Sequence, residues 1–151
     1  MLNPIPSEVD VAVIGAGSAG LPAFRAAREH TDRVILIERG PHGTTCARVG
    51  CMPSKLLIAA AEAAHGMKIA PGFGIHPGSI SIDGEAVMER VRRERDRFVG
   101  FVLDGVDRID PGQKISGQAR FVEDSRLEIG NSQVRAGRVV IASGTSPAIP
   151  D

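Results

Sequence analysis

The fold is decided by the stretch VDVAVIGAGSAGLPAFRAARE, residues 9–29, which changes its periodicity at the glycines. Residues 9–14 are short, apolar and β-branched, which is typical of a buried strand, whereas residues 21–29 are rich in Ala and Arg, as in a helix. Pro22 is compatible with that helix because no backbone donor is required in its first turn. A second apolar strand at residues 33–37 completes a βαβ unit, so we predict an α/β fold with parallel strands and crossover helices.

The glycines between strand and helix follow the pattern G-x-G-x-x-G. Gly15 permits a tight turn, Gly17 lets the backbone approach a pyrophosphate, and Gly20 allows close packing of helix on strand. The helix N-terminus supplies N–H groups and partial positive charge for phosphates. Glu38 ends the second strand, where its carboxylate can accept hydrogen bonds from ribose hydroxyls and would repel a 2′-phosphate. The sequence therefore favours FAD or NAD over NADP, and over the alternative of a glycine-rich turn without a ligand.

The rest of the chain predicts helices first and short strands afterwards. We expect one helix from Cys46 to about Ile69, distorted at its N-terminal end around Pro53, then a loop and a second helix capped by Asp83. The densely charged residues 89–97 are typical of a solvated helix face. The expected loop covers residues 71–78, the expected strands cover residues 114–122, 126–129, 133–135 and 138–142, and Gly130-Asn131 forms a tight turn between two of them.

Composition excludes several classes of function. The 151 residues suffice for about one domain, and a formal net charge of zero gives no electrostatic case for nucleic acid or an anionic membrane. No apolar run approaches the roughly 20 residues that span a bilayer, and the first six residues lack the features of a secretory signal. A cytoplasmic location is the default expectation. The four histidines show no zinc-ligand spacing, so we expect no metal site.

The chain has two cysteines, and both lie in the segment GTTCARVGCMPSK, residues 43–55. Cys46 and Cys51 stand beside a helix start, where they can reach disulfide distance if the turn is distorted, as Gly50 and Pro53 would permit. A helix N-terminus lowers the pKa of a thiol, and the thiolate is the reactive species. Two thiols are too few for a closed zinc site. Redox chemistry is therefore the favoured role, and two unrelated buried cysteines are the alternative.

This segment resembles the signature G-G-x-C-x-N-x-G-C-x-P-S-K of the class I pyridine nucleotide–disulfide oxidoreductases. Residues 117–121 and 141–147 are similar to the family's strand near the adenine and to its A-T-G-S-x-P flavin-domain motif. Thr44, Arg48 and Ser143 depart from the usual Gly, Asn and Thr. The resemblance implies a Rossmann-like FAD/NAD(P)-binding domain with a small antiparallel β-meander, of which residues 1–151 are the incomplete N-terminal segment.

The resemblance also implies roles for particular residues. Cys46 would be the interchange thiol that attacks the substrate, and Cys51 would face the flavin as the charge-transfer thiolate. Lys55 would lie near the reactive nitrogen of the flavin ring. The residues expected to bind FAD are Gly15, Gly17, Ser18, Ala19, Gly20, Glu38, Arg39, Thr45, Lys55, Ala119, Ala142, Ser143 and Gly144.

The sequence looks most like the dihydrolipoamide dehydrogenase branch, with mercuric and glutathione reductases as alternatives. The resemblance then implies an NAD-linked, FAD-dependent enzyme that oxidises dihydrolipoamide, acts on a small-molecule or lipoyl-domain disulfide, and forms a homodimer at full length. The nicotinamide-binding and dimerisation domains are not in this chain, so we expect weak FAD binding and no NADH-driven turnover from it alone. A non-catalytic nucleotide-binding or redox-sensing module is the competing interpretation.

Overall fold

A computed structural model describes residues 5–146 and 148–150 of the chain. These residues form two compact units. The sheet unit consists of the residues up to 44 together with those from 102 onward, and the helical unit consists of residues 45–101. Each unit is described by itself below.

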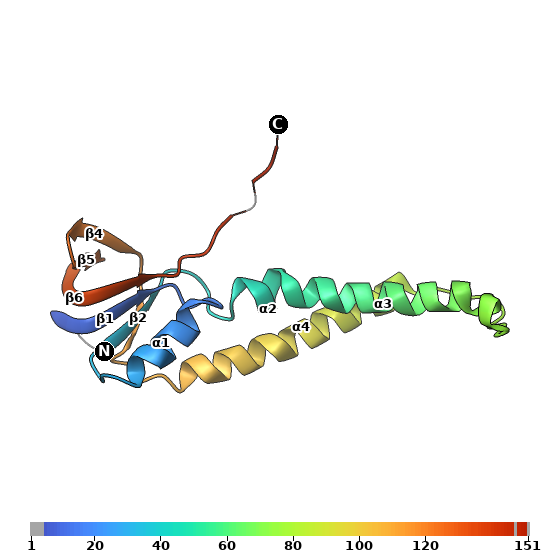
Figure 1. Ribbon diagram of the computed structural model, residues 1–151, viewed down its shortest axis with the longest axis horizontal. Helices are drawn as coiled ribbons and strands as arrows, with labels where there is room; N and C mark the ends of the chain where they lie inside the picture. The colour runs from blue at the N-terminus through green and yellow to red at the C-terminus, as the bar shows by residue number, and fades with distance from the viewer. Residues whose placement is uncertain (1–4, 147, 151) are drawn as a thin grey trace. The chain divides into compact units, whose positions relative to one another are not determined.

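The sheet unit contains a six-stranded mixed sheet, shown in Figure 1. Strand β1 is paired in parallel with β2 on one side and with β6 on the other, and β3 extends the parallel part beyond β2. Strands β4 and β5 form an antiparallel meander with β6. The predicted parallel sheet and meander are confirmed. The strands are β1 (Glu8–Ile14), β2 (Val34–Glu38), β3 (Lys114–Ser116), β4 (Ala119–Glu123), β5 (Arg126–Ile129) and β6 (Ser132–Ile141), in the order β3-β2-β1-β6-β5-β4.

Strand β6 belongs to both parts of the sheet. Its residues 132–135 pair with β5, and its residues 135–141 pair with β1. The two separate strands predicted here are therefore wrong. Gly137 does not end a strand; a side chain at this position would place its Cβ 3.1 Å from the carbonyl oxygen of Asp10, so glycine permits the close approach of β1. The tight turn at Gly130, which has a φ of 58°, is confirmed between β5 and β6.

The single strand predicted over residues 114–122 is also wrong, because it divides at Gly117 into β3 and β4. These two strands lie at opposite edges of the sheet, yet only two residues join them. Since each residue spans at most about 3.6 Å, the sheet must curl until its edges approach each other. Gly117 has a φ of 157°, and a Cβ there would lie 2.7 Å from Cγ2 of Ile129. The contact that requires glycine thus lies against β5, at the point where the chain passes from one edge strand to the other.

Two hydrophobic clusters cover the two faces of the parallel strands. One lies between these strands and the meander, and includes Ile35, Ile37, Leu127 and Val134. The other lies under helix α1 (Gly20–Arg28) and includes the last turns of helix α4 (Gly84–Asp107), through Val106. The βαβ arrangement predicted from the sequence is therefore supported by packing on both faces of the sheet.

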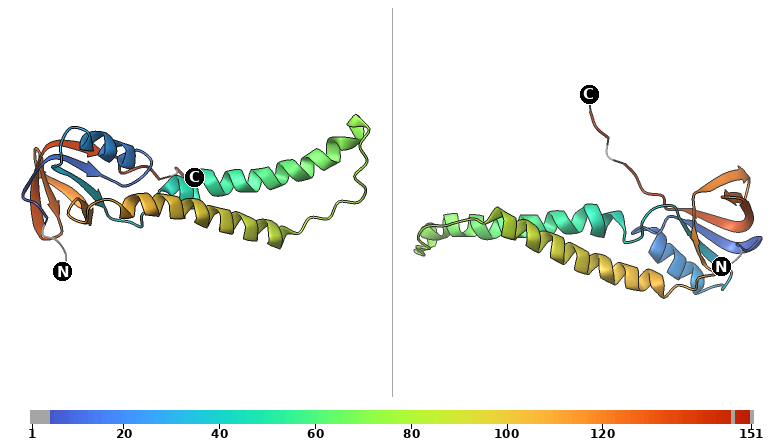
Figure 2. Two further views of the ribbon diagram at one scale, coloured as in Figure 1. Left: turned by 90° about the horizontal axis from the view of Figure 1, so that it is seen from below. Right: turned by 180° about the vertical axis from the view of Figure 1, so that it is seen from behind.

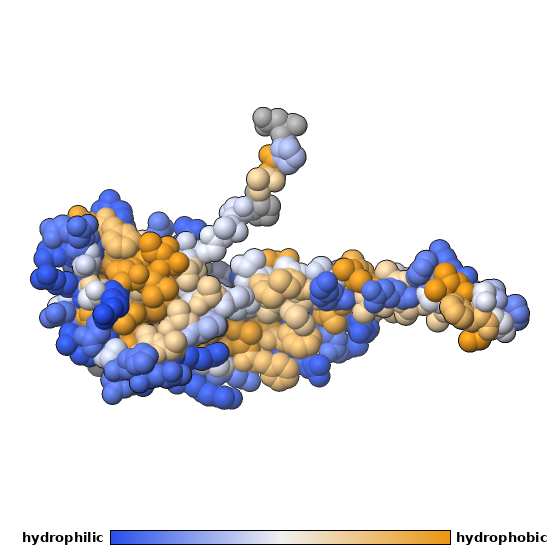
Figure 3. Space-filling view, in the orientation of Figure 1, coloured by the Kyte–Doolittle hydropathy of each residue, from blue (hydrophilic) through white to orange (hydrophobic). Residues whose placement is uncertain are grey.

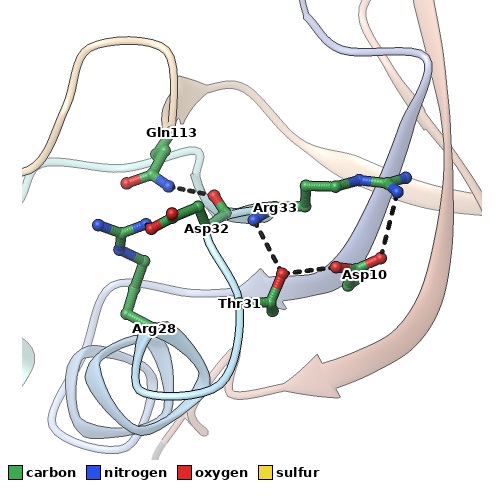
Figure 4. A network of polar contacts seen from close by, with 6 residues as sticks. All are labelled: Asp10, Arg28, Thr31, Asp32, Arg33 and Gln113. Atoms are coloured by element: carbon green, nitrogen blue, oxygen red, sulfur yellow. Dashed lines mark hydrogen bonds and ion pairs between the residues drawn. The ribbon is translucent and has the colours of Figure 1, made fainter.

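A polar network fixes the turn between α1 and β2 (Figure 4). The Thr31 hydroxyl donates to the carboxylate of Asp10, and the N–H of Arg33 donates to the same hydroxyl oxygen over 3.1 Å. The Arg33 guanidinium lies 3.6 Å from Asp10, and the side chain of Gln113 donates to the carbonyl of Asp32. The network links the start of β2 to β1 and to the segment that leads into β3.

The helical unit contains two antiparallel helices joined by a long connection (Figure 2). The single helix predicted from Cys46 is broken at Gly50, and Pro53 lies within the first turn of the longer helix rather than at the distortion. The Asp83 cap is confirmed, since its carboxylate accepts a bond from the N–H of Ala86 at 3.0 Å. The elements are α2 (Thr45–Val49), α3 (Cys51–Ile69), the 3₁₀ helix η1 (Ala70–Phe73) and most of α4.

Much of the apolar surface of the helical unit is uncovered. Helix α3 has no buried residue, and Leu57, Ile58 and Met67 on it are exposed. Figure 3 shows apolar side chains along the visible face of these helices. Among the described residues, no helix is both long and apolar enough to cross a membrane.

Candidate functional site

The glycine loop lies where three segments of the sheet unit meet. Gly15 has a φ of 103°, and its N–H donates to the carbonyl of Ile37 over 2.7 Å. A Cβ on Gly15 would lie 2.3 Å from the carbonyl oxygen of Ala142, and one on Gly20 would lie 1.7 Å from the carbonyl oxygen of Gly15. Backbone contacts therefore require glycine at both positions, as the sequence predicted for the tight turn and for helix packing.

Gly17 differs from these two glycines because its missing side chain faces open space. Apart from its two chain neighbours, no atom of the residues that the structure describes lies within 4 Å of the position a Cβ would take. The adjacent N-terminus of α1 has no side-chain cap at Ala19, and Ser18 and Ala19 are exposed. The first N–H groups of a helix have no partners within the helix and attract anions. The loop thus offers an accessible backbone surface that fits a phosphate group.

Glu38 lies beside the glycine loop and is oriented by backbone donors. Its Oε2 accepts a hydrogen bond from the N–H of Ala16 at 2.7 Å, and its Oε1 accepts one from Gly40 at 2.8 Å. Burial raises the pKa of this carboxyl, but hydrogen bonds from Ala16, Gly40 and Arg39, together with the charge of His42, hold the pKa below its usual value. The carboxylate is therefore ionised at neutral pH and presents acceptors only.

The other predicted nucleotide-binding residues of the sheet unit lie at the same end of the parallel strands as the glycine loop. The N–H of Gly117 donates to the carbonyl of Glu38, which brings the segment leading to Ala119 beside β2. The N–H of Ala142 donates to the carbonyl of Ile14, so Ser143 and Gly144 continue from β6 past the glycine loop. These positions lie at the carboxyl ends of the parallel strands, where α/β sheets bind ligands. Pro147, the last residue of the expected flavin motif, lies outside the described residues.

This edge of the sheet unit fits the adenosine diphosphate half of FAD. Gly17 and the start of α1 offer the backbone surface that a pyrophosphate needs, and Glu38 offers the acceptors that ribose hydroxyls need. The fit depends on the open space at Gly17, on the N–H donors at the start of α1 and on the acceptor oxygens of Glu38. All three features lie within the sheet unit.

The cysteine pair lies at the break between the two N-terminal helices of the helical unit. Cys46 is half-buried on α2 and Cys51 is exposed as the first residue of α3; both are free thiols that share a side-chain hydrogen bond. A Cβ on Gly50 would lie 3.2 Å from the carbonyl oxygen of Thr45 and 3.6 Å from Cα of Cys46. Glycine at the break therefore lets the start of α3 lie close to the first residues of α2.

The acidity of Cys46 differs from the sequence-based expectation. The hydrogen bond with Cys51 raises the pKa of Cys46, and burial and the charge of Cys51 raise it further, while a backbone hydrogen bond lowers it. The helix start does not outweigh these effects, because α2 has only five residues. In the reduced chain, Cys46 is therefore mainly a thiol at neutral pH.

Thr45 and Lys55 are the other predicted site residues in the helical unit. Thr45 is the exposed first residue of α2, and Lys55 is exposed on α3, one turn after Cys51. These residues and the cysteine pair form one group within the helical unit. The glycine loop, Glu38 and the residues after β6 form a second group within the sheet unit.

The loop after β2 contains two features that the sequence did not indicate as functional. His42 has a buried Nδ1 atom without a hydrogen-bond partner among the described residues. Thr44 has a φ of 59°, a conformation that is costly for a β-branched residue, at the position where the signature has glycine. A lone histidine in a loop carries no periodicity or spacing, so no sequence signal could have identified His42.

Comparisons with known proteins support the resemblance stated above. The sequence profile of the family described as "Pyridine nucleotide-disulphide oxidoreductase" matches residues 9–151. The chain is 34% identical over 145 residues to a mercuric reductase from Lysinibacillus sphaericus, covering 93% of this chain and 26% of that protein. It is 37% identical over 152 residues to a mercuric reductase from Serratia marcescens, covering 94% of this chain and 32% of that protein.

A solved structure is similar in fold. The HOCl-induced flavoprotein disulfide reductase RclA from Escherichia coli aligns with 96% of this chain at a TM-score of 0.68 and 22% identity, in a complex with Cu(II). The alignment covers 30% of that protein. The chain thus spans a third or less of the length of the relatives described here.

Proposed function

Because the chain belongs to the pyridine nucleotide-disulphide oxidoreductase family, we propose that it binds FAD through its sheet unit and exchanges electrons with a substrate through Cys46 and Cys51. The observation that carries the proposal is the helix break at Gly50, which places two free cysteines close together, Cys46 on α2 and Cys51 at the start of α3. We further propose that the chain is the N-terminal segment of the FAD-binding domain of a longer enzyme.

In this proposal FAD supplies a two-electron carrier between a reduced pyridine nucleotide and the cysteine pair. The chain's own residues bind and orient it. Gly17 and the first turn of α1 receive the pyrophosphate, and Glu38 accepts hydrogen bonds from ribose hydroxyls. Ala142, which closes on Gly15, keeps the turn of the glycine loop tight.

The cysteine pair would transfer electrons by thiol–disulfide exchange. The Cys46 thiolate attacks one sulfur of a substrate disulfide, so that a mixed disulfide forms and the first substrate thiolate leaves. The Cys51 thiolate then attacks the sulfur of Cys46, which closes the internal disulfide and releases the second substrate thiolate. The substrate gains two electrons, the pair loses two, and the leaving thiolates take up the protons that the cysteines gave up.

The names of the similar proteins support a mercuric reductase-like substrate better than dihydrolipoamide. Several curated relatives are named mercuric reductase, and they are 30–37% identical to this chain. Two adjacent thiols are also suitable ligands for a soft metal ion, since thiolate ligands select soft metals. We therefore propose a mercuric reductase-like substrate, in which Cys46 and Cys51 each give up a proton and displace a ligand of Hg²⁺.

Two titrations of the 151-residue chain test this proposal. Flavin fluorescence during titration with FAD should show saturable binding. Thiol counting during titration of the reduced chain with Hg²⁺ should show both thiols lost at one equivalent, whereas single Cys46→Ala or Cys51→Ala variants should require two chains per ion. Absence of FAD binding would contradict the cofactor proposal. Two results together would favour dihydrolipoamide as the substrate. One is faster reduction of the internal disulfide by dihydrolipoamide than by glutathione at equal thiolate concentration. The other is binding of Hg²⁺ by only one thiol.

A further inference from the structure

A pocket of about 270 Å³ lies in the sheet unit at the opposite end of β1 from the glycine loop. It forms where the first residues of β1, β6 and β5 meet, and these three strands are neighbours in the sheet (Figure 1). Because β1 runs from this pocket to Gly15, the pocket and the glycine loop are about 20 Å apart. The residues that line the pocket are Ser7, Glu8, Arg126, Gln133, Val134 and Arg135.

The strand register places the charged residues of the pocket in one row. Glu8 of β1 and Arg126 of β5 are the partners of Arg135 on the two sides of β6. Partners in neighbouring strands have their side chains on the same face of a sheet. The residues next to them along each strand are buried in the core on the other face: Val9, Leu127, Val134 and Ala136. The charged row therefore lies on the face away from this core.

Two arginines thus stand opposite each other in the antiparallel pair of β5 and β6. Like charges in this arrangement destabilise a sheet. Arg126 lies 3.6 Å from the carboxylate of Glu123, whereas Arg135 forms no ion pair among the residues that the structure describes. Arg120 on β4 differs from both, because Glu128 lies 2.7 Å from it and neutralises its charge. A bound anion would offset the repulsion between Arg126 and Arg135.

We propose that this pocket binds inorganic phosphate in a form that carries a proton. A guanidinium group binds an oxyanion through paired N–H donors, so one arginine is enough for the two oxygens of a carboxylate. A tetrahedral phosphate has oxygens for both Arg126 and Arg135, and the amide of Gln133 adds a neutral donor. None of these residues belongs to the proposed FAD site or to the dithiol, so the inference is independent of the proposed function.

Glu8 determines which oxyanion the pocket accepts. It is the register partner of Arg135, yet it forms no ion pair in the part of the chain that the structure describes. Its carboxylate can only accept hydrogen bonds. Inorganic phosphate at neutral pH keeps at least one P–OH group, which can donate to this carboxylate. Sulfate and the dianion of a phosphate monoester have no such proton, so Glu8 would repel them.

Calorimetric titration of the 151-residue chain, in a phosphate-free buffer of low ionic strength, tests the proposal. The wild-type chain should bind one phosphate ion with a Kd on the order of 1 mM, and sulfate about tenfold more weakly. Arg126→Gln and Arg135→Gln should each raise the Kd for phosphate about tenfold, the loss expected for one charge-assisted hydrogen bond. Arg120→Gln is the matched control, because this arginine does not line the pocket, and it should leave the Kd unchanged.

Glu8→Gln tests the role of the proton on the ion. An amide group can donate a hydrogen bond, so this variant should bind sulfate about tenfold more tightly than the wild-type chain does. Equal affinity of the wild-type chain for phosphate and sulfate would overturn the proposal. Phosphate binding that is absent at about 10 mM, or unchanged in both arginine variants, would overturn it as well.

Two further measurements keep this result separate from the proposed function and from folding. Titration of Arg135→Gln with FAD should give the same Kd as titration of the wild-type chain, so failure of the phosphate site would leave the FAD site in place. Circular dichroism of each variant should match the wild-type spectrum, because the replaced side chains lie on the face away from the core.

Discussion

Cys51 controls the acidity of Cys46 because their side chains share a hydrogen bond at the Gly50 break. This bond is the largest contribution that raises the pKa of Cys46, and the Cys51 charge adds to it after burial. The thiolate is the attacking species, so the reactivity of Cys46 in the reduced chain should depend on what occupies position 51.

We predict that Cys51→Ala lowers the pKa of Cys46 toward its ordinary value. The rate of Cys46 alkylation by iodoacetamide, followed by mass spectrometry from pH 6 to about 10.5, should therefore rise at lower pH in the variant than in the wild-type chain. Cys51→Ser is the matched control, because its hydroxyl preserves a hydrogen-bonding group and should keep part of the shift. Superimposable pH profiles for the wild-type chain and Cys51→Ala would contradict this prediction.

Glu38 contributes stability in the form that accepts backbone hydrogen bonds, the ionised one. Because its folded-state pKa lies below its unfolded value, this contribution is present above the unfolded pKa and is lost as pH falls through the folded pKa. We predict that Glu38→Gln reduces the free energy of unfolding at pH 7 by about 1 kcal/mol, a modest figure since solvent screens a partly buried group.

Urea unfolding at several pH values measures this contribution. The difference between the wild-type chain and Glu38→Gln should shrink as pH is lowered from 7 to below about 4. Glu62→Gln, on the exposed surface of α3, should leave the free energy of unfolding within about 0.5 kcal/mol at every pH. A difference for Glu38→Gln that stays constant with pH would show that the carboxylate charge is not what the backbone donors stabilise.

At the level of helices and strands, the proposed dithiol chemistry depends on the break between α2 and α3. The helix is interrupted at Gly50, where the backbone lies close to Thr45 and Cys46, so Cys46 and Cys51 do not lie on one continuous helix. Ser54 stabilises the first turn of α3, since its N–H donates to the carbonyl of Gly50 at 3.3 Å and its hydroxyl to the carbonyl of Cys51 at 3.0 Å.

We predict that Gly50→Ala weakens the internal disulfide. Its Cβ would lie 3.2 Å from the carbonyl oxygen of Thr45, so the two helices must separate slightly. The equilibrium constant for disulfide formation in a glutathione buffer should fall about tenfold, which corresponds to about 1.4 kcal/mol. Gly66→Ala is the control; no atom lies near its Cβ, so it should leave the disulfide unchanged and stabilise α3 by about 0.5–1 kcal/mol. Equal disulfide stability in Gly50→Ala would contradict this role of the break.

Elements with local signals were predicted correctly, and those set by distant contacts were not. The strand that ends at Gly15, the turn at Gly130 and the cap at Asp83 each depend on residues within a few positions. The division of a strand at Gly117 depends on Ile129, and the continuity of β6 through Gly137 depends on Asp10 of another strand. Neither partner can be identified from periodicity, because pairing across a sheet is not encoded in the spacing of a single segment.

In the candidate site, too, the features that depend on local sequence were predicted and those that depend on packing were not. The glycine loop and Glu38 were predicted because each lies at a fixed offset from a strand end, and the structure brings them together through the N–H of Ala16. The sequence indicated a distorted turn at Gly50 or Pro53 between the two cysteines, and the structure breaks the helix at Gly50; the redox pairing of the cysteines stays a prediction. The burial of one ring nitrogen of His42 could not be predicted from the sequence, since it depends on how the loop packs.

At the scale of the whole molecule, the chain assigns its two proposed tasks to two compact units. The sheet unit provides an anion-binding helix start and a fixed carboxylate, on a sheet that curls because only two residues join its opposite edges. The helical unit provides the dithiol at the break between α2 and α3. The proposed cofactor chemistry and the proposed dithiol chemistry can therefore be measured separately in the same chain.

In the proposed chemistry, the two cysteines of one chain form a reversible disulfide with each other. The most direct measurement equilibrates the chain in buffers of reduced and oxidised glutathione, traps the thiols by alkylation, and determines the mass of each species. We predict a monomeric chain that interconverts between a form with two free thiols and a form with none, with the bond mapped to Cys46 and Cys51. Stable mixed disulfides with glutathione, or bonds only between chains, would contradict it.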